Sequence, residues 1–369
     1  MEGEPIKLFV APPFDASPPV LFIRLLASFK EQLPPSLHAR KEQLRFNASI
    51  VSRAEDADFV VISQAVKHTT PAYASYVAEV AREAKKYNTP VLSFFKGDLS
   101  YKEHVEGSWA FKISAFRSAD WRTRRNSEVI NVPYAEDVSR TIPFTPRHKS
   151  ARPSVSFCGF AGFDSRTTRL KYVGKNMFLD GVSFVTGKLH LSAYKRGIYF
   201  RRAAIRALQG DSRIDSHIIL RDSFVAQAAP SKEKRMELWK EYIDNLVSAD
   251  FALAPRGDAN ISIRFYEALS AGRIPILIDT DCVLPLESVV EYDTFILRVP
   301  HTKMHELGER ILAFYETLSD EEFVAMQYRA REAFEKYVRY DSFFNVALPL
   351  LKKHGPMALC PVRSHGSLK

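Results

Sequence analysis

The chain has 369 residues, of which 46% are hydrophobic and 26% are charged. This balance excludes an intrinsically disordered chain, and the length suits two domains better than one. Lys and Arg outnumber Asp and Glu by 52 to 43, which gives a net charge of +9. We therefore expect an anionic partner, such as a phosphorylated small molecule, a nucleic acid or an acidic membrane surface.

The cysteines and the N-terminus indicate the compartment. The three cysteines are far apart and form no CxxC pair, which argues against a disulfide framework and against a zinc site. Residues 1–7 are partly acidic and lead directly into a strand-like run, unlike a signal peptide. No apolar run approaches the roughly 20 residues that span a bilayer. We expect a cytoplasmic protein that can associate with a membrane surface at most.

In the first half of the chain, short apolar runs alternate with helical patterns. Residues 6–11, 59–63 and 91–95 are typical of buried strands, and residues 20–33 and 72–87 have helical periodicity. The second of these helices is expected to begin at Pro71, with Thr70 as its N-cap. The alternation predicts βαβ units and a mostly parallel sheet.

A Pro-rich, basic stretch at residues 142–153 breaks the pattern and is interpreted as a linker. After it, the alternation resumes. The expected strands are 155–160, 182–185, 214–220, 250–254, 274–278 and 295–299, and the expected helices are 195–209, 231–248 and 262–271. A capping box, Ser319-x-x-Glu322, begins an amphipathic helix that is followed by another at 342–353. We therefore predict α/β domains at 1–150 and 151–335, with a helical tail at 336–369 that packs on the first domain.

The segment from Pro255 to Asp279 carries the strongest chemical signal. It follows a short strand and reads as a loop, a helix from about residue 262 to 271, Gly272 as C-cap and a second strand. A loop between a strand's carboxyl end and a helix N-terminus is where open α/β sheets bind ligands. The N–H groups and the positive dipole end of that helix suit a phosphate.

Three side chains of this segment fit a nucleotide. Arg256 and Arg264 lie on either side of the loop and can neutralise a diphosphate. Glu267 follows Arg264 by three residues on the same helix face, where a carboxylate can accept both hydroxyl hydrogens of a ribose. The alternatives are an ordinary helical ion pair between Arg264 and Glu267, and a solvated loop position for Arg256.

The string PRGDANISIRFYEALSAGRIPILID resembles the C-terminal signature of the exostosin family of inverting glycosyltransferases, with its P-x-G, S-x-R-x-x-E-A and G-x-I-P elements. The resemblance implies the GT-B fold, two Rossmann-like domains facing across a cleft, with C-terminal helices. It also implies that the second domain binds the nucleotide sugar, with donor-binding roles for Ser262, Arg264 and Glu267. The string SFCGFAGFDSRTTRL is similar to the opening of that domain, which makes Arg166 and Arg169 candidate phosphate ligands.

As a member of this family, the chain would transfer a hexosyl or pentosyl group with inversion from a nucleotide diphosphate sugar, by expectation a UDP-sugar. The acceptor would be a glycan in surface polysaccharide or glycoprotein glycan synthesis. No metal or other cofactor and no nucleic-acid partner are expected. Two rival hypotheses remain open: a non-catalytic glycan-binding or assembly subunit with the same fold, and another α/β enzyme that processes sugar nucleotides.

The first half departs from the family pattern. In EDADFVVIS, residues 55–63, Ser63 replaces the proline of the family strand, and KGDLSYKEH occupies the place of the family's Asp-His-Phe motif. An inverting transfer needs a general base on a loop at the carboxyl end of a strand in this half. Asp98 is our first candidate because it directly follows a buried strand and a glycine, and Asp15 and His68 are the alternatives.

Two further groups have less specific patterns. Arg201 and Arg202 lie in a basic helical stretch, where they either reach a phosphate or are solvated. His301 and His305 have the i,i+4 spacing of a metal pair, but no third ligand follows, so we expect solvated histidines.

Overall fold

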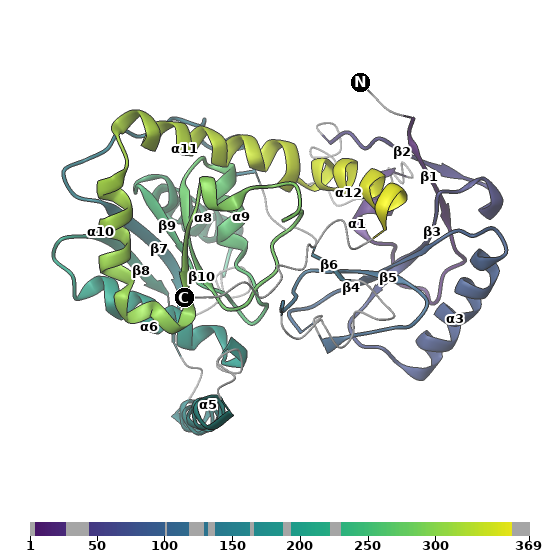
Figure 1. The fold of residues 1–369 in the computed structure, drawn as a ribbon, viewed down its shortest axis with the longest axis horizontal. Helices are drawn as coiled ribbons and strands as arrows, with labels where there is room; N and C mark the ends of the chain where they lie inside the picture. Colours follow the sequence, from purple (N-terminus) through teal and green to yellow (C-terminus); the bar gives the residue numbers. More distant parts are fainter. Residues whose placement is uncertain are drawn as a thin grey trace. The chain divides into compact units, whose positions relative to one another are not determined.

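The computed structural model describes residues 4–26, 44–99, 102–117, 129–131, 137–162, 166–186, 193–221 and 230–355 (Figure 1). The chain divides into two compact units. The first contains residues 1–133, 283–291 and 336–369, and the second contains residues 134–282 and 292–335. Each unit has its own parallel sheet, which confirms the expected α/β fold with two sheets.

The first unit is built on a six-stranded parallel sheet in the order β2-β1-β3-β4-β5-β6. The strands are β1 (Ile6–Val10), β2 (Ala48–Val51), β3 (Phe59–Val66), β4 (Val91–Phe95), β5 (Trp109–Lys112) and β6 (Val129–Asn131). Its helices are α1 (Leu21–Leu26), α3 (Pro71–Lys85), α12 (Tyr340–His354) and the short 3-10 turn η2 (Ala54–Asp56). The hydroxyl of Thr70 accepts a hydrogen bond from the N–H of Tyr73, so Thr70 is the N-cap of α3, as its sequence predicts.

Helix α12 belongs to the first unit although it lies near the end of the chain. The ring of Phe344 stacks on Phe22 with a centroid separation of 4.0 Å. The carboxylate of Asp341 accepts the backbone N–H of Arg45, and the side-chain oxygen of Asn345 accepts that of Asn47. The last described helix therefore completes the core of a unit that begins with the first strand.

The second unit has a five-stranded parallel sheet in the order β11-β10-β9-β7-β8. The strands are β7 (Ser154–Phe160), β8 (Asp215–Arg221), β9 (Phe251–Ala254), β10 (Ile274–Asp279) and β11 (Leu297–Pro300). The helices are α5 (Arg166–Thr186), α6 (Gly197–Gln209), α8 (Lys232–Val247), α9 (Ile263–Ser270), α10 (Leu307–Thr317) and α11 (Asp320–Ala333), with short 3-10 turns η4 (Val138–Arg140), η6 (Tyr292–Thr294) and η7 (His301–Glu306). A π-helical turn at Phe334–Val338 connects α11 to the segment that returns to the first unit.

The side chains of β9 alternate between the two faces of the sheet, and both faces are covered by helices. Phe251 and Leu253 pack in the cluster that contains residues of α6 and α10. Ala252 points to the opposite face and packs with residues of α8 and α9. A strand whose successive side chains are all buried must be covered on both sides, so β9 lies in the interior of a doubly wound sheet.

Two expected features differ from the structure. Residues 182–185, expected as a strand, form the end of α5, because a short apolar run fits a helix end as well as a strand. Residues 142–153, expected as a linker, lie within the second unit, where Nζ of Lys149 donates to the carbonyls of Tyr315 and Leu318. In the described part of the chain, no helix is both long enough and apolar enough to cross a membrane.

Candidate functional site

The strand order of the second unit places a topological switch point between β7 and β9. From β7 the chain continues to β8 on one side of the sheet, whereas from β9 it continues to β10 on the other side. The loops at the carboxyl ends of β7 and β9 therefore diverge, and ligands of open α/β sheets bind where this occurs. The loop after β9 is the segment that the sequence singled out.

Arg201, on α6, connects the two diverging loops. Its Nη1 donates to the carbonyl of Phe160 at 2.9 Å, and its Nε donates to the carbonyl of Arg256 at 3.2 Å. The neighbouring Arg202 donates to the carbonyl of Ala161 at 3.2 Å. Both arginines were expected to reach a phosphate or to be solvated. In the structure Arg201 bonds to the backbone on both sides of the switch point, and Arg202 bonds to the backbone on the β7 side.

The beginning of α6 is in direct contact with the loop after β9. A Cβ atom on Gly197 would lie well inside van der Waals distance of the carbonyl oxygens of Arg256 and Gly257. Only glycine allows the helix to approach the loop backbone this closely.

The side chain of Arg256 is occupied within its own loop. It is 4% exposed, and its nitrogens donate to the carbonyls of Ala193 and Asp258 and to the side-chain oxygen of Asn260. Asn260 in turn bonds to Thr280 at the end of β10. This geometry favours a role in shaping the loop over the phosphate-binding role expected for Arg256.

Arg264 lies in the first turn of α9 and is 6% exposed. Its guanidinium lies over the rings of Tyr242 and Phe157, 4.6 and 5.0 Å from their centroids, and its Nη2 donates to the carbonyl of Cys158. Its Nη1 is buried and has no hydrogen-bond partner among the residues that the structure describes. Because buried N–H groups are nearly always paired, this atom indicates a position where an acceptor oxygen belongs.

Glu267, one turn further along α9, is 7% exposed and accepts a hydrogen bond from the phenol of Tyr242. Burial raises the pKa of Tyr242 far above its usual range, so the phenol is a proton donor at neutral pH. Among the ion pairs of the described residues, none links Arg264 to Glu267. The two charged side chains instead meet on Tyr242, a residue to which no sequence motif points.

Ser262 is the N-cap residue of α9, with extended backbone angles and no capping hydrogen bond from its side chain. The side chain therefore leaves the N–H groups of the first turn uncovered. Arg166 and Arg169 lie in the first turn of α5, which begins six residues after β7 ends. Their side chains lie outside the described part of the structure.

The three candidate bases follow adjacent strands of the first unit. Asp15 follows β1, His68 follows β3 and Asp98 follows β4; because these strands are parallel neighbours, the three residues lie at one edge of the sheet. Asp15 and Asp98 are exposed, and the hydrogen bond from the N–H of Ser17 holds the pKa of Asp15 below its usual value.

His68 is distinguished by a carboxylate partner. Its Nδ1 lies 3.0 Å from Glu103, whose other carboxylate oxygen accepts the N–H of Thr69. Burial alone would raise the pKa of Glu103, but the bonds from Thr69 and His68 outweigh burial and lower it. The side chain of His68 is 63% exposed, so an ionised carboxylate orients a solvent-accessible imidazole.

His301 and His305 lie in different surroundings. His305 is exposed as expected, but His301 packs edge-to-face against Phe200, with ring centroids 5.8 Å apart, and burial lowers its pKa. His301 is therefore half-buried, whereas a solvated position was expected. Within the described ranges, no group of three or more His, Cys, Asp or Glu side chains could hold a metal ion.

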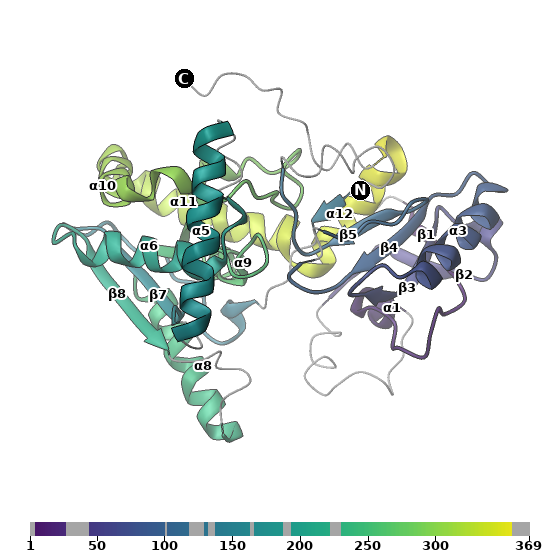
Figure 2. The ribbon, with the colours of Figure 1, turned by 90° about the horizontal axis from the view of Figure 1, so that it is seen from below.

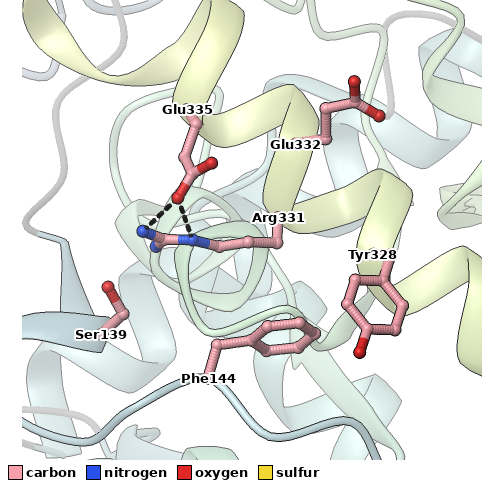
Figure 3. A pocket seen from close by; sticks show the side chains of 6 residues that line it. All are labelled: Ser139, Phe144, Tyr328, Arg331, Glu332 and Glu335. Carbon is pink, nitrogen blue, oxygen red and sulfur yellow. Dashed lines mark hydrogen bonds and ion pairs between the residues drawn. The ribbon is translucent and has the colours of Figure 1, made fainter.

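Neither Arg264 nor Glu267 lines the two cavities found among the described residues. One, of about 790 Å³, lies along β8 and α8. The other, of about 460 Å³, lies beside α11 and is lined by Ser139, Phe144, Tyr328, Arg331, Glu332 and Glu335 (Figure 3). Arg331 pairs there with Glu335 and with Asp137. A Cβ on Gly272 would collide with the ring of Phe144. These contacts hold α11 and the 137–144 segment against the sheet.

Three comparisons relate the chain to known proteins. Residues 186–313 match the family model of the exostosin GT47 domain. Over 81 residues the chain is 37% identical to Exostosin-1 of Drosophila melanogaster, a match that covers 20% of this chain and 11% of the fly protein. A crystal structure of a glycosyltransferase from Rickettsia africae ESF-5 aligns with 95% of this chain and 98% of its own, at 12% identity and a TM-score of 0.40.

The family match includes the loop after β9, helix α9 with Arg264 and Glu267, and the N-terminal turn of α6 that contacts the loop. The segment that the sequence singled out therefore lies in the region that is similar to the exostosin GT47 domain.

Proposed function

We propose that this chain is an inverting glycosyltransferase that takes a sugar from a nucleotide diphosphate sugar, a UDP-sugar, and transfers it to a glycan acceptor without a metal ion. The proposal rests on one arrangement: Arg264 and Glu267 of α9 both contact Tyr242 of α8. Arg264 and Glu267 are buried, Tyr242 is half-buried between them, and all three lie beside the switch point and inside the exostosin match.

In this proposal the diphosphate binds at the first turn of α9. Nη1 of Arg264 donates to a phosphate oxygen, which gives the buried guanidinium the acceptor that the described residues do not supply. The N–H groups of the first turn and the positive end of the helix dipole add to this. As the bond between the anomeric carbon and the diphosphate breaks, negative charge develops on the leaving group, and these groups stabilise it.

The ribose binds one turn further, at Glu267. A carboxylate can accept several hydrogen bonds at once, so Glu267 can hold ribose hydroxyls together with the phenol of Tyr242. Glu267 follows Arg264 by three residues, about 4.5 Å along the helix axis, so the proposed ribose site lies next to the proposed diphosphate site.

The acceptor hydroxyl attacks the anomeric carbon while a base of the first unit takes its proton. Asp98, Asp15 and His68 remain the candidates. The contact with Glu103 supports His68, because an imidazole oriented by a carboxylate is a common general base. We expect that replacing the true base by Ala lowers kcat by about 100-fold or more, whereas Ala at the other two positions changes it little.

The first test is calorimetric titration with UDP. Glu267→Ala and Arg264→Ala should each weaken UDP binding by at least about tenfold, because each removes hydrogen bonds to a charged group. The exposed Glu316 and Arg235 supply the matched controls Glu316→Ala and Arg235→Ala, which should bind as the wild type does. Unchanged affinity in Glu267→Ala would refute the ribose assignment.

The second test measures UDP released from a panel of UDP-sugars with and without glycan acceptors. Turnover with any donor supports the enzyme. UDP binding without hydrolysis or transfer of any donor would instead identify a glycan-binding or assembly subunit with the same fold.

A further inference from the structure

Helix α5 of the second unit presents an apolar face to solvent. Figures 1 and 2 show α5 on the outer side of α6, away from the sheet. Along its 21 residues, large hydrophobic side chains are between 45% and 86% exposed. They are Leu170, Val173, Met177, Phe178, Phe184 and Val185.

These side chains form one continuous stripe. Leu170, Met177 and Phe184 are spaced by seven residues and therefore lie on one line of the helix, with Val173 on one side and Phe178 on the other. Two glycines of the same arc, Gly174 and Gly181, have no atom within 4 Å of the position that a Cβ would occupy, so nothing in the described structure covers the stripe between the large side chains. The stripe runs over about 22 Å of helix.

The other side of α5 faces its own unit. Asn176, Leu179 and Val182 are partly buried, and Asp180 pairs with Lys195 at 2.5 Å. In most surface helices the apolar face packs on the protein and the polar face is exposed. In α5 the contacts with its own unit are partly polar, and the most hydrophobic side chains are exposed. The two exposed phenylalanines alone present on the order of 300 Å² of apolar surface, which is within the range at which a patch marks an interaction site.

The charge of the helix identifies the occupant. The sequence of α5 has four basic residues, Arg166, Arg169, Lys171 and Lys175, against the single acidic Asp180, which is already paired. Even if Arg166 and Arg169 serve the donor site, two lysines remain. A second copy of the chain would bring the same basic helix and a net charge of +9, so self-association through this face is opposed by like charges. The complementary surface is both apolar and anionic.

We propose that α5 is an interfacial membrane anchor, which lies in the plane of an anionic lipid surface with its apolar stripe inserted among the acyl chains. A helix with Phe, Leu and Met on one face and basic residues beside it has the composition of such anchors. The stripe is one-sided and stands on a projecting helix, which suits a planar surface better than a groove. The site does not depend on the nucleotide or on turnover.

The test is co-sedimentation of the full chain with vesicles of phosphatidylcholine alone or mixed with phosphatidylserine, without any donor. Wild-type protein should bind the anionic vesicles, less at high salt. The double variant M177E/F184E should reduce the partition coefficient at least tenfold, because it replaces two inserted apolar side chains by charges. The matched control is Met236→Glu, at an exposed methionine of α8, which should bind as the wild type does.

Several outcomes would overturn the proposal. Wild-type protein that stays in the supernatant with anionic vesicles, or M177E/F184E protein that binds as well as the wild type, excludes the anchor. If the lipid-free wild type is a dimer by analytical ultracentrifugation and M177E/F184E is a monomer, a second copy covers the stripe instead. Circular dichroism of the variant checks that the fold is retained. The variant should also bind UDP as the wild type does, so that failure of the membrane proposal can be distinguished from failure of the proposed transferase function.

Discussion

Tyr242 lies between the two charged side chains of α9 and has a separate role for each. Its ring lies against the guanidinium of Arg264, and its phenol donates to Glu267. Both charges are buried without pairing with each other, so the tyrosine supplies part of the environment that keeps them in place. We regard Tyr242 as a positioning residue of the proposed donor site.

The variant Tyr242→Phe separates the two roles. It keeps the ring under Arg264 and removes only the hydroxyl, so Glu267 loses one donor. We expect UDP affinity to fall by about fivefold, which corresponds to the net free energy of one ordinary hydrogen bond. The melting temperature should change little. Calorimetry and a thermal melt measure the two quantities. If the variant binds UDP like the wild type, the phenol does not position Glu267.

Asp137 makes stability depend on pH. Burial alone would raise its pKa, but bonds from Arg331, at 2.7 and 3.2 Å, and from Ser139 outweigh burial and hold the pKa below its usual value. A carboxyl group with a lowered folded pKa contributes stability above its unfolded pKa of about 3.9, and that stability is lost as the pH falls through the folded value.

The variant Asp137→Asn should remove this contribution. We expect a loss of about 1–3 kcal/mol of unfolding free energy at neutral pH, because Arg331 keeps Glu335 but loses its more buried partner. Below the folded pKa of Asp137 the difference from the wild type should shrink towards zero. Urea unfolding at a series of pH values measures it, and a difference that is constant with pH would contradict the assignment.

At the level of elements, the contact between α6 and the loop after β9 determines where the loop lies. Arg201 holds the loop by hydrogen bonds, and Gly197 allows the helix to touch it. Since the loop precedes α9 directly, a shift of α6 would move the first turn of α9 and with it Arg264.

The variant Gly197→Ala tests this coupling. Its methyl group would overlap backbone carbonyls, which cannot rotate away, so we expect a destabilisation of about 1–3 kcal/mol. UDP binding should weaken as well. Gly210→Ala, at the C-cap of the same helix, is the control, because the nearest atom to the added methyl group, the carbonyl oxygen of Arg206, is 3.5 Å away. Equal effects of the two substitutions would show that the loop contact does not matter.

At the level of the whole molecule, the chain leaves the first unit, builds the second and then returns. Residues 283–291 and 336–369 join the first unit from far along the sequence. Phe344, in the returning α12, is fully buried and packs against Phe22 and Phe111. The core of the first unit therefore depends on residues at both ends of the chain.

We expect Phe344→Ala to destabilise the first unit by about 3–5 kcal/mol, through lost burial and the cavity that remains. Hydrogen exchange should show faster opening of β1, β3 and α1, with the protection of β9 and β10 unchanged. Phe184→Ala, at an exposed phenylalanine, is the matched control. If β9 and β10 lose protection and β1, β3 and α1 do not, then α12 does not stabilise the first unit as we infer.

The sequence alone determined the elements whose signals are local. The helix expected at residues 262–271 is α9 at Ile263–Ser270, and the strands expected at 91–95 and 155–160 agree with β4 and β7 to within a residue. Their signals, a run of apolar residues, a cap and a C-terminal glycine, act over a few residues and survive in any tertiary context. The exostosin-like motif is also local, and it lies within residues 186–313, which match the exostosin GT47 model.

Only the tertiary structure decided which distant groups meet. Tyr242 is 25 residues from Glu267, Arg201 is 55 from Arg256 and Glu103 is 35 from His68. Nothing in the period of an isolated helix specifies such partners, because contacts between elements follow from strand order and helix packing. The same reason explains why residues 182–185 were expected as a strand. Their apolar run is compatible with either structure. As the end of α5, the run contributes Phe184 and Val185 to the exposed stripe, which no described residue of the same unit covers.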